Sequence, residues 1–222
     1  MKLVIVAALG TILLAGCAQD KMASKDKMAM KSGNEAHAHI GHVMTGWGDT
    51  PGGMGLLPTA QAEAKVAAQH IEFALKDQND LGSIKLHIGH VLHAVDPETE
   101  PNGPGKGYGL IKAAQGVRVH IGASAGSDDA SDNVRLHTEH VSASAANVVA
   151  WGEEIVALAR RVKGAYGAEE AATWARRIQT LVACINQGCD ADGDGTVSWG
   201  PGEGGLAQAA QHMGFMMTGE GL

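Results

Sequence analysis

Hydrophobic residues recur every three or four positions through most of the chain, a spacing typical of amphipathic helices. Over residues 81–95 the apolar stripe consists of Ile84, Ile88, Val91 and Val95. Pro97 follows, and a proline disfavours the helical conformation in the residue before it. The pattern therefore predicts a helix that ends at about residue 95.

The same periodicity extends to other segments and repeats itself. It predicts helices over residues 59–78, 81–95, 108–123, 130–162 and 173–186, and another that begins near residue 203. One offset of 50 residues relates His70 to His120, His87 to His137 and His90 to His140. A shared offset indicates a duplicated unit. We predict an all-α fold, with a four-helix bundle built from a tandem helix-pair repeat over residues 37–165 and a helix–loop–helix unit over residues 166–222.

Composition narrows the functional classes. Aromatic residues make up 4% of the chain, which has 31 glycines, so the core must consist of closely approaching helices. The net charge is −7 and no basic patch carries interleaved aromatics, which argues against a nucleic-acid partner. No nucleophile–base set, phosphate loop or carboxylate pair makes a case for an enzyme. Three histidines around a metal with an open position would nevertheless suffice for one.

The first residues combine one lysine, a short apolar run and the sequence LAGC at residues 14–17. This resembles the signal peptide and lipobox of bacterial lipoproteins. The resemblance implies that residues 1–16 are removed and that lipid on Cys17 anchors the protein to the membrane on the periplasmic side. Ala18 favours the outer membrane, and an uncleaved signal anchor is the alternative. Residues 17–36 are polar and lysine-rich, which predicts a disordered tether. A protein partner stays unknown.

Histidines form the most repetitive chemical feature of the chain. The sequence HIGHV at residues 39–43 has copies at 87–91 and, as HTEHV, at 137–141. Residues three apart are neighbours on a helix, so such a pair can chelate one ion. We expect the bundle to gather His70, His87, His120 and His137 near its interior. The candidate metal ligands are His70, His87, His90, His120, His137 and His140.

Three interpretations of these histidines stay open. Imidazole is a good ligand for copper, zinc or nickel, which supports a transition-metal site. Two histidines can also hold a b-type haem in an electron-transfer protein, whereas covalent attachment is excluded because C-x-x-C-H is absent. Duplication can equally retain ordinary surface or core histidines in a structural envelope module. The segments AAQHIEFAL and IKLHIGHVLHAV resemble helices of small periplasmic histidine-rich metal-binding proteins, which implies metal binding.

A second candidate ion site lies near the C-terminus. The sequence DADGDGTVS at residues 190–198 resembles the calcium loop of the EF-hand family, in which alternating carboxylates converge on the cation. At loop position twelve, however, Pro201 replaces the expected glutamate, so either Glu203 closes an extended loop or the site binds weakly. The alternative is an Asp/Gly-rich turn between two helices. The candidate Ca²⁺ ligands are Asp190, Asp192, Asp194, Thr196, Ser198 and Glu203.

Cys184 and Cys189 stand just before this loop. Outside the cytoplasm they are expected to form a disulfide, and a metal dithiolate is the alternative. After the loop, His212 opens an H-M-x-x-M-M segment that either holds copper or packs as an apolar stripe.

Overall fold

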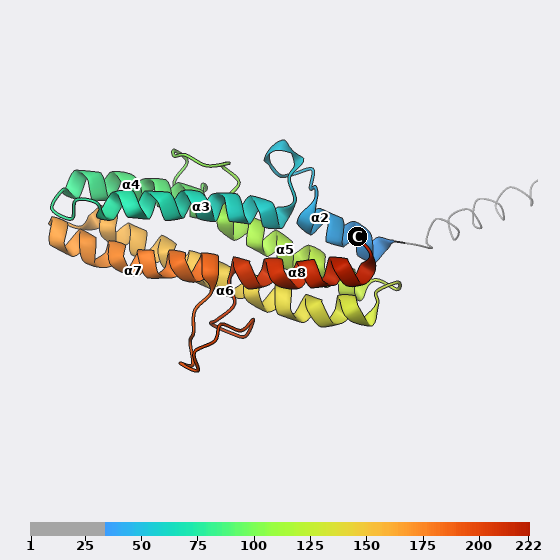
Figure 1. Cartoon of the computed structure of the whole chain (residues 1–222). Helices are drawn as coiled ribbons and strands as arrows, with labels where there is room; N and C mark the ends of the chain where they lie inside the picture. Colours follow the sequence, from blue (N-terminus) through green and yellow to red (C-terminus); the bar gives the residue numbers. More distant parts are fainter. Residues whose placement is uncertain (1–33) are drawn as a thin grey trace, which may run out of the picture. The chain divides into compact units, whose positions relative to one another are not determined.

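The computed structural model describes residues 34–222, and every regular element in this part of the chain is helical (Figure 1). This confirms the predicted all-α bundle. The predicted signal peptide, Cys17 and the tether up to residue 33 lie outside the described residues. The elements are α2 (Glu35–Met44), the 3-10 turn η1 (Pro51–Gly53), α3 (Leu56–Leu75), α4 (Leu81–Val95), α5 (Leu110–Gly126), α6 (Asp132–Gly164), α7 (Ala168–Gln187) and α8 (Leu206–Glu220).

Within residues 35–222 the helices pack as two four-helix groups that share α6 (Figure 1). One group consists of α3, α4, α7 and the C-terminal part of α6, and the other consists of α2, α5, α8 and the N-terminal part of α6. Helix α6 has 33 residues, so at 1.5 Å per residue it is about 50 Å long and can serve both groups. The last two helices, α7 and α8, pack against α6 and complete the two groups.

Small side chains let these helices approach closely, as the composition predicts. The buried face of α3 includes Ala60, Ala64 and Ala67. A Cβ atom on Gly116 would lie 2.7 Å from a methyl carbon of the buried Leu56, so any larger residue here would force the Leu56 side chain to move. The core therefore depends on close packing, in which even one added methyl group is felt.

Local side-chain caps fix the N-termini of α4 and α6. Asp80 caps α4 by accepting a hydrogen bond from the backbone N–H of Ser83 at 3.0 Å, and Ser131 caps α6 in the same way at Val134. Helix α4 has the predicted bounds, and the other predicted helices that correspond to α3 and α5–α8 differ from the structure by one to five residues at their ends.

Helix α2 was not predicted, because the group that caps it is distant in the sequence. The carboxylate of Asp129, between α5 and α6, accepts hydrogen bonds from the backbone N–H groups of Glu35 and Ala36 at 2.9 and 3.1 Å. Ser124 donates to the carbonyl of Ala36 at 2.8 Å. Ten residues form too short a helix to be stable alone, so α2 depends on these tertiary contacts.

The segment between α4 and α5 is fastened by a buried carboxylate. Glu63 on α3 is 0% exposed, and its side chain accepts hydrogen bonds from the backbone N–H groups of Lys106, Tyr108 and Gly109 at 3.0–3.2 Å. These charge-assisted bonds compensate for burying the carboxylate. They hold the glycine- and proline-rich connection against α3 and so fix where α5 begins.

Candidate metal centres

Nine of the eleven histidines lie in three clusters of three within residues 34–222. Each cluster, called a triad here, combines an H-x-x-H pair on one helix with a single histidine on a neighbouring helix. All nine side chains are half-buried. Site A is His39, His42 and His120; site B is His70, His87 and His90; site C is His137, His140 and His212.

Site B shows how the sequence builds a triad. His87 and His90 are one turn apart on α4, so their rings leave the helix on the same side. Helix α3 packs against α4 and brings His70 to them, because the two helices form a hairpin. The Nδ1 atom of His70 lies 3.1 Å from Nδ1 of His87 and 3.2 Å from Nδ1 of His90.

Site A repeats this geometry between α2 and α5. Nδ1 of His120 lies 3.0 Å from Nδ1 of His39 and 3.3 Å from Nδ1 of His42. The pair comes from the short helix α2, so site A forms only where α2 is docked on α5.

Site C joins α6 to the C-terminal helix α8. Nδ1 of His212 lies 3.1 Å from Nδ1 of both His137 and His140. Each triad thus links two helices through the same atom type and at the same spacing.

These distances suit a metal ion better than hydrogen bonds. An Nδ1 atom carries either one N–H or one lone pair in the ring plane, so it can make one well-aligned hydrogen bond but not two. Three nitrogens at bonds of 2.0–2.1 Å around a tetrahedral zinc ion are separated by about 3.3 Å. The observed 3.0–3.3 Å is close to this edge, and one ion can use all three lone pairs.

In each triad the surroundings favour the neutral form of the single histidine that faces the pair, because they lower its pKa. Burial lowers the pKa of His70 and His120, and the neighbouring histidines lower it further because the charges of protonated rings repel one another. The effect is largest at His212, where burial first, and then His140 and His137, lower the pKa to about 4. Neutral imidazole is the form that binds metal, so the site is ready to accept an ion at neutral pH.

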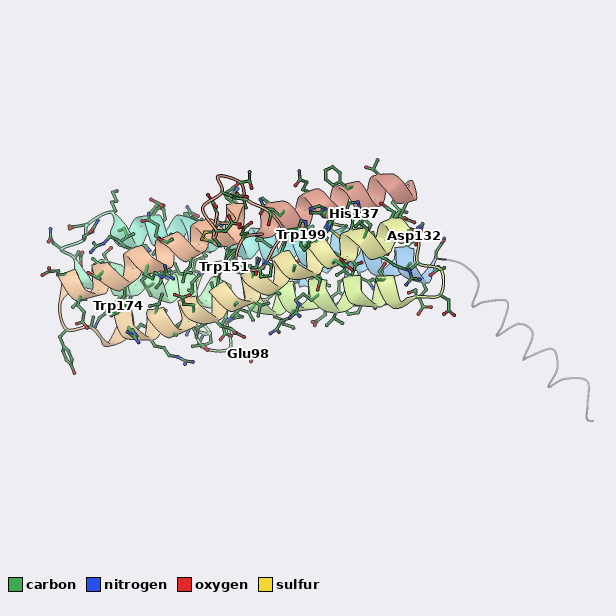
Figure 2. The ribbon with its side chains drawn as sticks, turned by 90° about the horizontal axis from the view of Figure 1, so that it is seen from below. Glu98, Asp132, His137, Trp151, Trp174 and Trp199 are labelled. Atoms are coloured by element: carbon green, nitrogen blue, oxygen red, sulfur yellow. A yellow bond between two sulfur atoms is a disulfide. The ribbon has the colours of Figure 1, made fainter. Side chains whose placement is uncertain are left out.

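Aromatic rings surround the triads unequally. In site C the indole of Trp199 stacks on His140 with ring centroids 4.1 Å apart. Trp199 lies in the loop before α8 (Figure 2). Phe215 packs beside His137 and His212 in the same site at 5.8 and 5.7 Å.

The other two sites each have one such neighbour. In site A the Trp47 ring packs against His42 and His120 at 4.7 and 4.4 Å. In site B, Phe73 packs against His70 and His87 at 5.4 and 5.3 Å, and it is 39% exposed.

The structure brings some predicted ligands together and separates others. His70, His87 and His90 meet in site B, and His137 and His140 meet in site C. The four histidines expected to converge in the interior do not do so. His70 on α3 lies with the pair His87 and His90 on α4. His120 lies instead with the pair on α2.

Three ligands, His39, His42 and His212, are absent from the predicted set. The first two belong to the first HIGHV copy, which was recognised as a repeat but placed outside any predicted helix. His212 lies in the sequence AAQHMGF at residues 209–215, which matches AAQHIEF at residues 67–73. This second repeat, A-A-Q-H-x-x-F, marks the single histidine of two triads and could have identified the third ligand of site C.

The acidic loop forms a separate, exposed cluster in which carboxylate oxygens of Asp190, Asp192 and Asp194 lie within 4.8 Å of one another. Asp190 accepts hydrogen bonds from the backbone N–H groups of Gly193 and Gly195 at 2.7 and 3.0 Å. The loop is thus wound around its first aspartate.

The C-terminal half of the loop folds back onto its start. The buried Glu203 accepts a hydrogen bond from the backbone N–H of Ser198 at 2.9 Å, and bonding to Ser198 lowers the pKa of the Glu203 carboxyl. Thr196 donates its backbone N–H to Asp194 at 2.8 Å. On α6, Asn147 donates to the carbonyls of Gly200 and Gly204 at 2.8 and 3.0 Å and so fastens the loop to the bundle.

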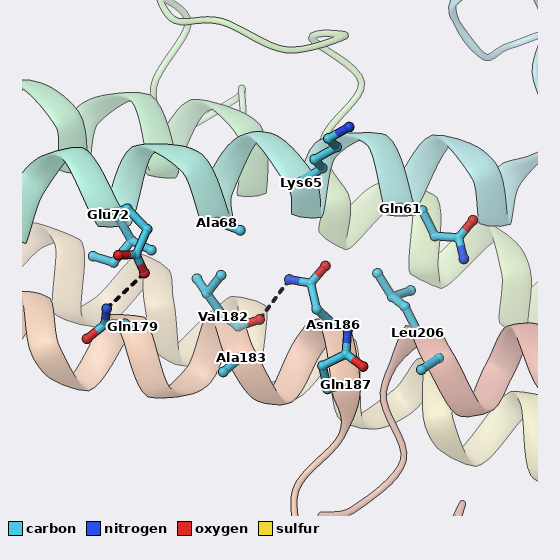
Figure 3. A pocket seen from close by; sticks show the side chains of 12 residues that line it. Gln61, Lys65, Ala68, Glu72, Gln179, Val182, Ala183, Asn186, Gln187 and Leu206 are labelled. Carbon is cyan, nitrogen blue, oxygen red and sulfur yellow. Dashed lines mark hydrogen bonds between the residues drawn. The ribbon is translucent and has the colours of Figure 1, made fainter.

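The cysteine pair and a surface groove lie outside the triads. Cys184 and Cys189 lie at disulfide-bonding distance, with Cα atoms 5.0 Å apart. A groove of 580 Å³ runs between α3 and α7, but the polar groups Gln179 and Glu72 on its walls bond to each other (Figure 3). Its lining residues include no histidine or cysteine.

Among residues 34–222 no helix is both long and apolar enough to cross a membrane. No protein-family model, curated protein or solved structure matches the chain. The function must therefore be inferred from the three triads themselves, which can each hold a transition-metal ion.

Proposed function

We propose that this protein binds three transition-metal ions, one at each histidine triad. The observation that carries the proposal is that, in three separate places, the Nδ1 atom of one histidine lies 3.0–3.3 Å from the Nδ1 atoms of two others. Zinc and copper are the ions of choice, because both bind imidazole strongly and accept three nitrogen ligands.

The arrangement argues against ordinary structural histidines. Like charges repel, so three imidazoles at contact distance destabilise one another whenever they become protonated. Hydrogen bonding between the rings offers only partial compensation, since each central Nδ1 has two close neighbours and one bonding position. An ion removes both costs at once, which gives a physical reason for assembling the same triad three times.

The triads do not suit a b-type haem. Two axial histidines bind iron from opposite faces of the porphyrin, so their nitrogens are separated by two metal–nitrogen bonds, about 4 Å, with the macrocycle between them. Within a triad the close nitrogens are 3.0–3.3 Å apart and leave no room for a ring system between them.

We further propose that the protein holds or delivers metal on the periplasmic side of a bacterial envelope. The lipobox-like LAGC sequence and the cysteine pair at bonding distance support an anchored protein in an oxidising compartment. Three similar sites let one chain hold several ions, and their half-buried position lets ions exchange with solvent. Both features favour metal sequestration or transfer over a single structural ion. Cys17→Ser should release the protein from the membrane fraction, while wild type remains bound; wild type in the soluble fraction would refute the anchor.

Calcium binding by the acidic loop is part of the same proposal. Alternating carboxylates of Asp190, Asp192 and Asp194 supply hard oxygen ligands, and Glu203 lies close enough to the loop to bond to Ser198. Because the loop is fastened to α6 by Asn147 and carries Trp199, an ion there would stabilise the segment that covers site C.

The test of the main proposal is metal stoichiometry. Purified protein is loaded with zinc or Cu(I), desalted, and measured by native mass spectrometry and elemental analysis. We expect three ions per chain, and one fewer in each of the variants His70→Ala, His120→Ala and His212→Ala.

The matched controls are the two histidines outside the triads. His37 pairs with Glu220, and His93 lies 2.8 Å from the carbonyl of Glu100, so neither is a ligand. His37→Ala and His93→Ala should keep all three ions. Fewer than one tightly bound ion in wild type, or equal loss in triad and control variants, would refute the proposal.

A further inference from the structure

Each triad supplies three ligands and no more from the acidic, cysteine and histidine side chains of residues 34–222. Zinc sites with a purely structural role are closed by four protein ligands, whereas three protein ligands leave a position for water or substrate. The half-buried state of all nine imidazoles places these positions near solvent. A metal ion bound here therefore takes a further ligand from outside the chain.

The surroundings make the three sites unequal. Site C has aromatic rings on two sides, with Trp199 stacked on His140 and Phe215 beside His212. Site B has a single aromatic neighbour, Phe73, and no tryptophan ring among its aromatic contacts.

We propose, on the basis of the proposed metal binding, that an ion in site B keeps a solvent-facing coordination position that takes water or a small anion, whereas Trp199 and Phe215 shield the ion in site C. An incoming ligand needs such a position to reach the metal. Site B is thus the point at which metal enters and leaves most readily, and site C is the storage position.

Cobalt(II) provides a direct readout because its visible absorption bands depend on coordination. A protein with only site B is made by His120→Ala with His212→Ala, and one with only site C by His70→Ala with His120→Ala. Each is loaded with one equivalent of cobalt and titrated with azide. Site B should show a saturable band shift, and site C should require more azide, by roughly fivefold, the equivalent of one displaced aromatic contact of about 1 kcal/mol.

Trp199→Ala in the protein with only site C gives the decisive comparison. Removing the indole should raise the azide affinity of site C towards that of site B. Trp174→Ala should leave it unchanged, because Trp174 on α7 packs under Arg161 and makes no ring contact with site C. Unchanged bands in the site B protein, or equal azide affinity in both proteins with no effect of Trp199→Ala, would overturn the inference.

Two measurements distinguish a failure of the proposed metal binding from a failure of the proposed shielding. Cobalt content measured before the titration reports on the proposed function, because a protein without one bound equivalent has no site to test. Wild-type protein loaded with three zinc ions is also mixed with a chromophoric chelator. Shielding predicts at least two release phases, with the slow phase accelerated by Trp199→Ala; a single phase that this substitution leaves unchanged counts against it.

Discussion

Replacing His212 by alanine removes one of the three ligands of site C and leaves sites A and B complete. His212 is the only histidine that α8 contributes to a triad, so the substitution also removes the metal link between α6 and α8. We expect the variant to bind two ions in place of three. We also expect it to gain less stability from zinc than wild type does.

The size of the effect follows from the number of independent sites. An ion that binds only the folded state contributes about 2.7 kcal/mol when its free concentration is one hundred times its dissociation constant. Three such sites contribute roughly 8 kcal/mol, and His212→Ala should remove about one third of this. For a chain of this size, 1 kcal/mol corresponds to about 2–4 °C, so the zinc-induced rise in melting temperature should shrink by roughly 5–10 °C.

The assay is thermal unfolding followed by circular dichroism, with and without zinc, for both proteins. Using the difference between the two conditions cancels any packing change that the substitution causes in the metal-free protein. His93→Ala is the control, because its ring lies outside the triads. An undiminished zinc-induced shift in His212→Ala, together with three bound ions, would show that site C is not a metal site.

Three further predictions concern proton binding, the buried carboxylate and the acidic loop. The folded-state pKa of His212, about 4, lies below its ordinary value of 6.5, so its contribution to metal-free stability is complete above pH 6.5 and is lost as the pH falls through about 4; the melting temperature of His212→Asn should vary less over this range, and equal curves would contradict the assignment. Glu63→Ala leaves three backbone N–H groups without their acceptor and should lower the free energy of unfolding, measured in urea, by roughly 2–4 kcal/mol. The control Glu72→Ala removes only an exposed contact with Gln179 and should change this free energy little. Equal effects of the two substitutions would argue against the role of Glu63. Calorimetry should detect one calcium ion with a dissociation constant of roughly 10⁻⁴–10⁻³ M that is lost in Asp194→Asn, and the absence of calcium uptake by wild type would leave the loop as a turn between two helices.

Periodicity predicted the helices whose ends are determined locally. Asp80 and Pro97 are both visible in the sequence, and α4 accordingly has the predicted bounds. Helix α2 could not be predicted in this way, because its N-terminal amides bond to Asp129, a residue more than 90 positions away. The same limit applies to the way in which α7 and α8 complete the two four-helix groups.

The sequence predicted only part of each triad, for a related reason. An H-x-x-H pair is a local pattern, so His87 with His90 could be recognised as neighbours on one helix. The third ligand comes from another helix, and the sequence does not state which helices pack together. The predicted bundle gathered His120 with His70, His87 and His137, but α5 presents His120 to the pair on α2. The H-M-x-x-M-M segment marked His212 as a possible copper ligand, and the A-A-Q-H-x-x-F repeat relates it to His70.

The distant cap of α2 has a consequence for biosynthesis. A ribosome makes residues 35–44 early, yet Asp129, which holds the first amides of this helix, is translated more than 90 residues later. His39 and His42 therefore wait for most of the chain before they can meet His120. Site C is completed later still, when residue 212 appears. The hairpin that carries site B needs nothing beyond residue 95, so it is the first triad that the growing polypeptide can assemble.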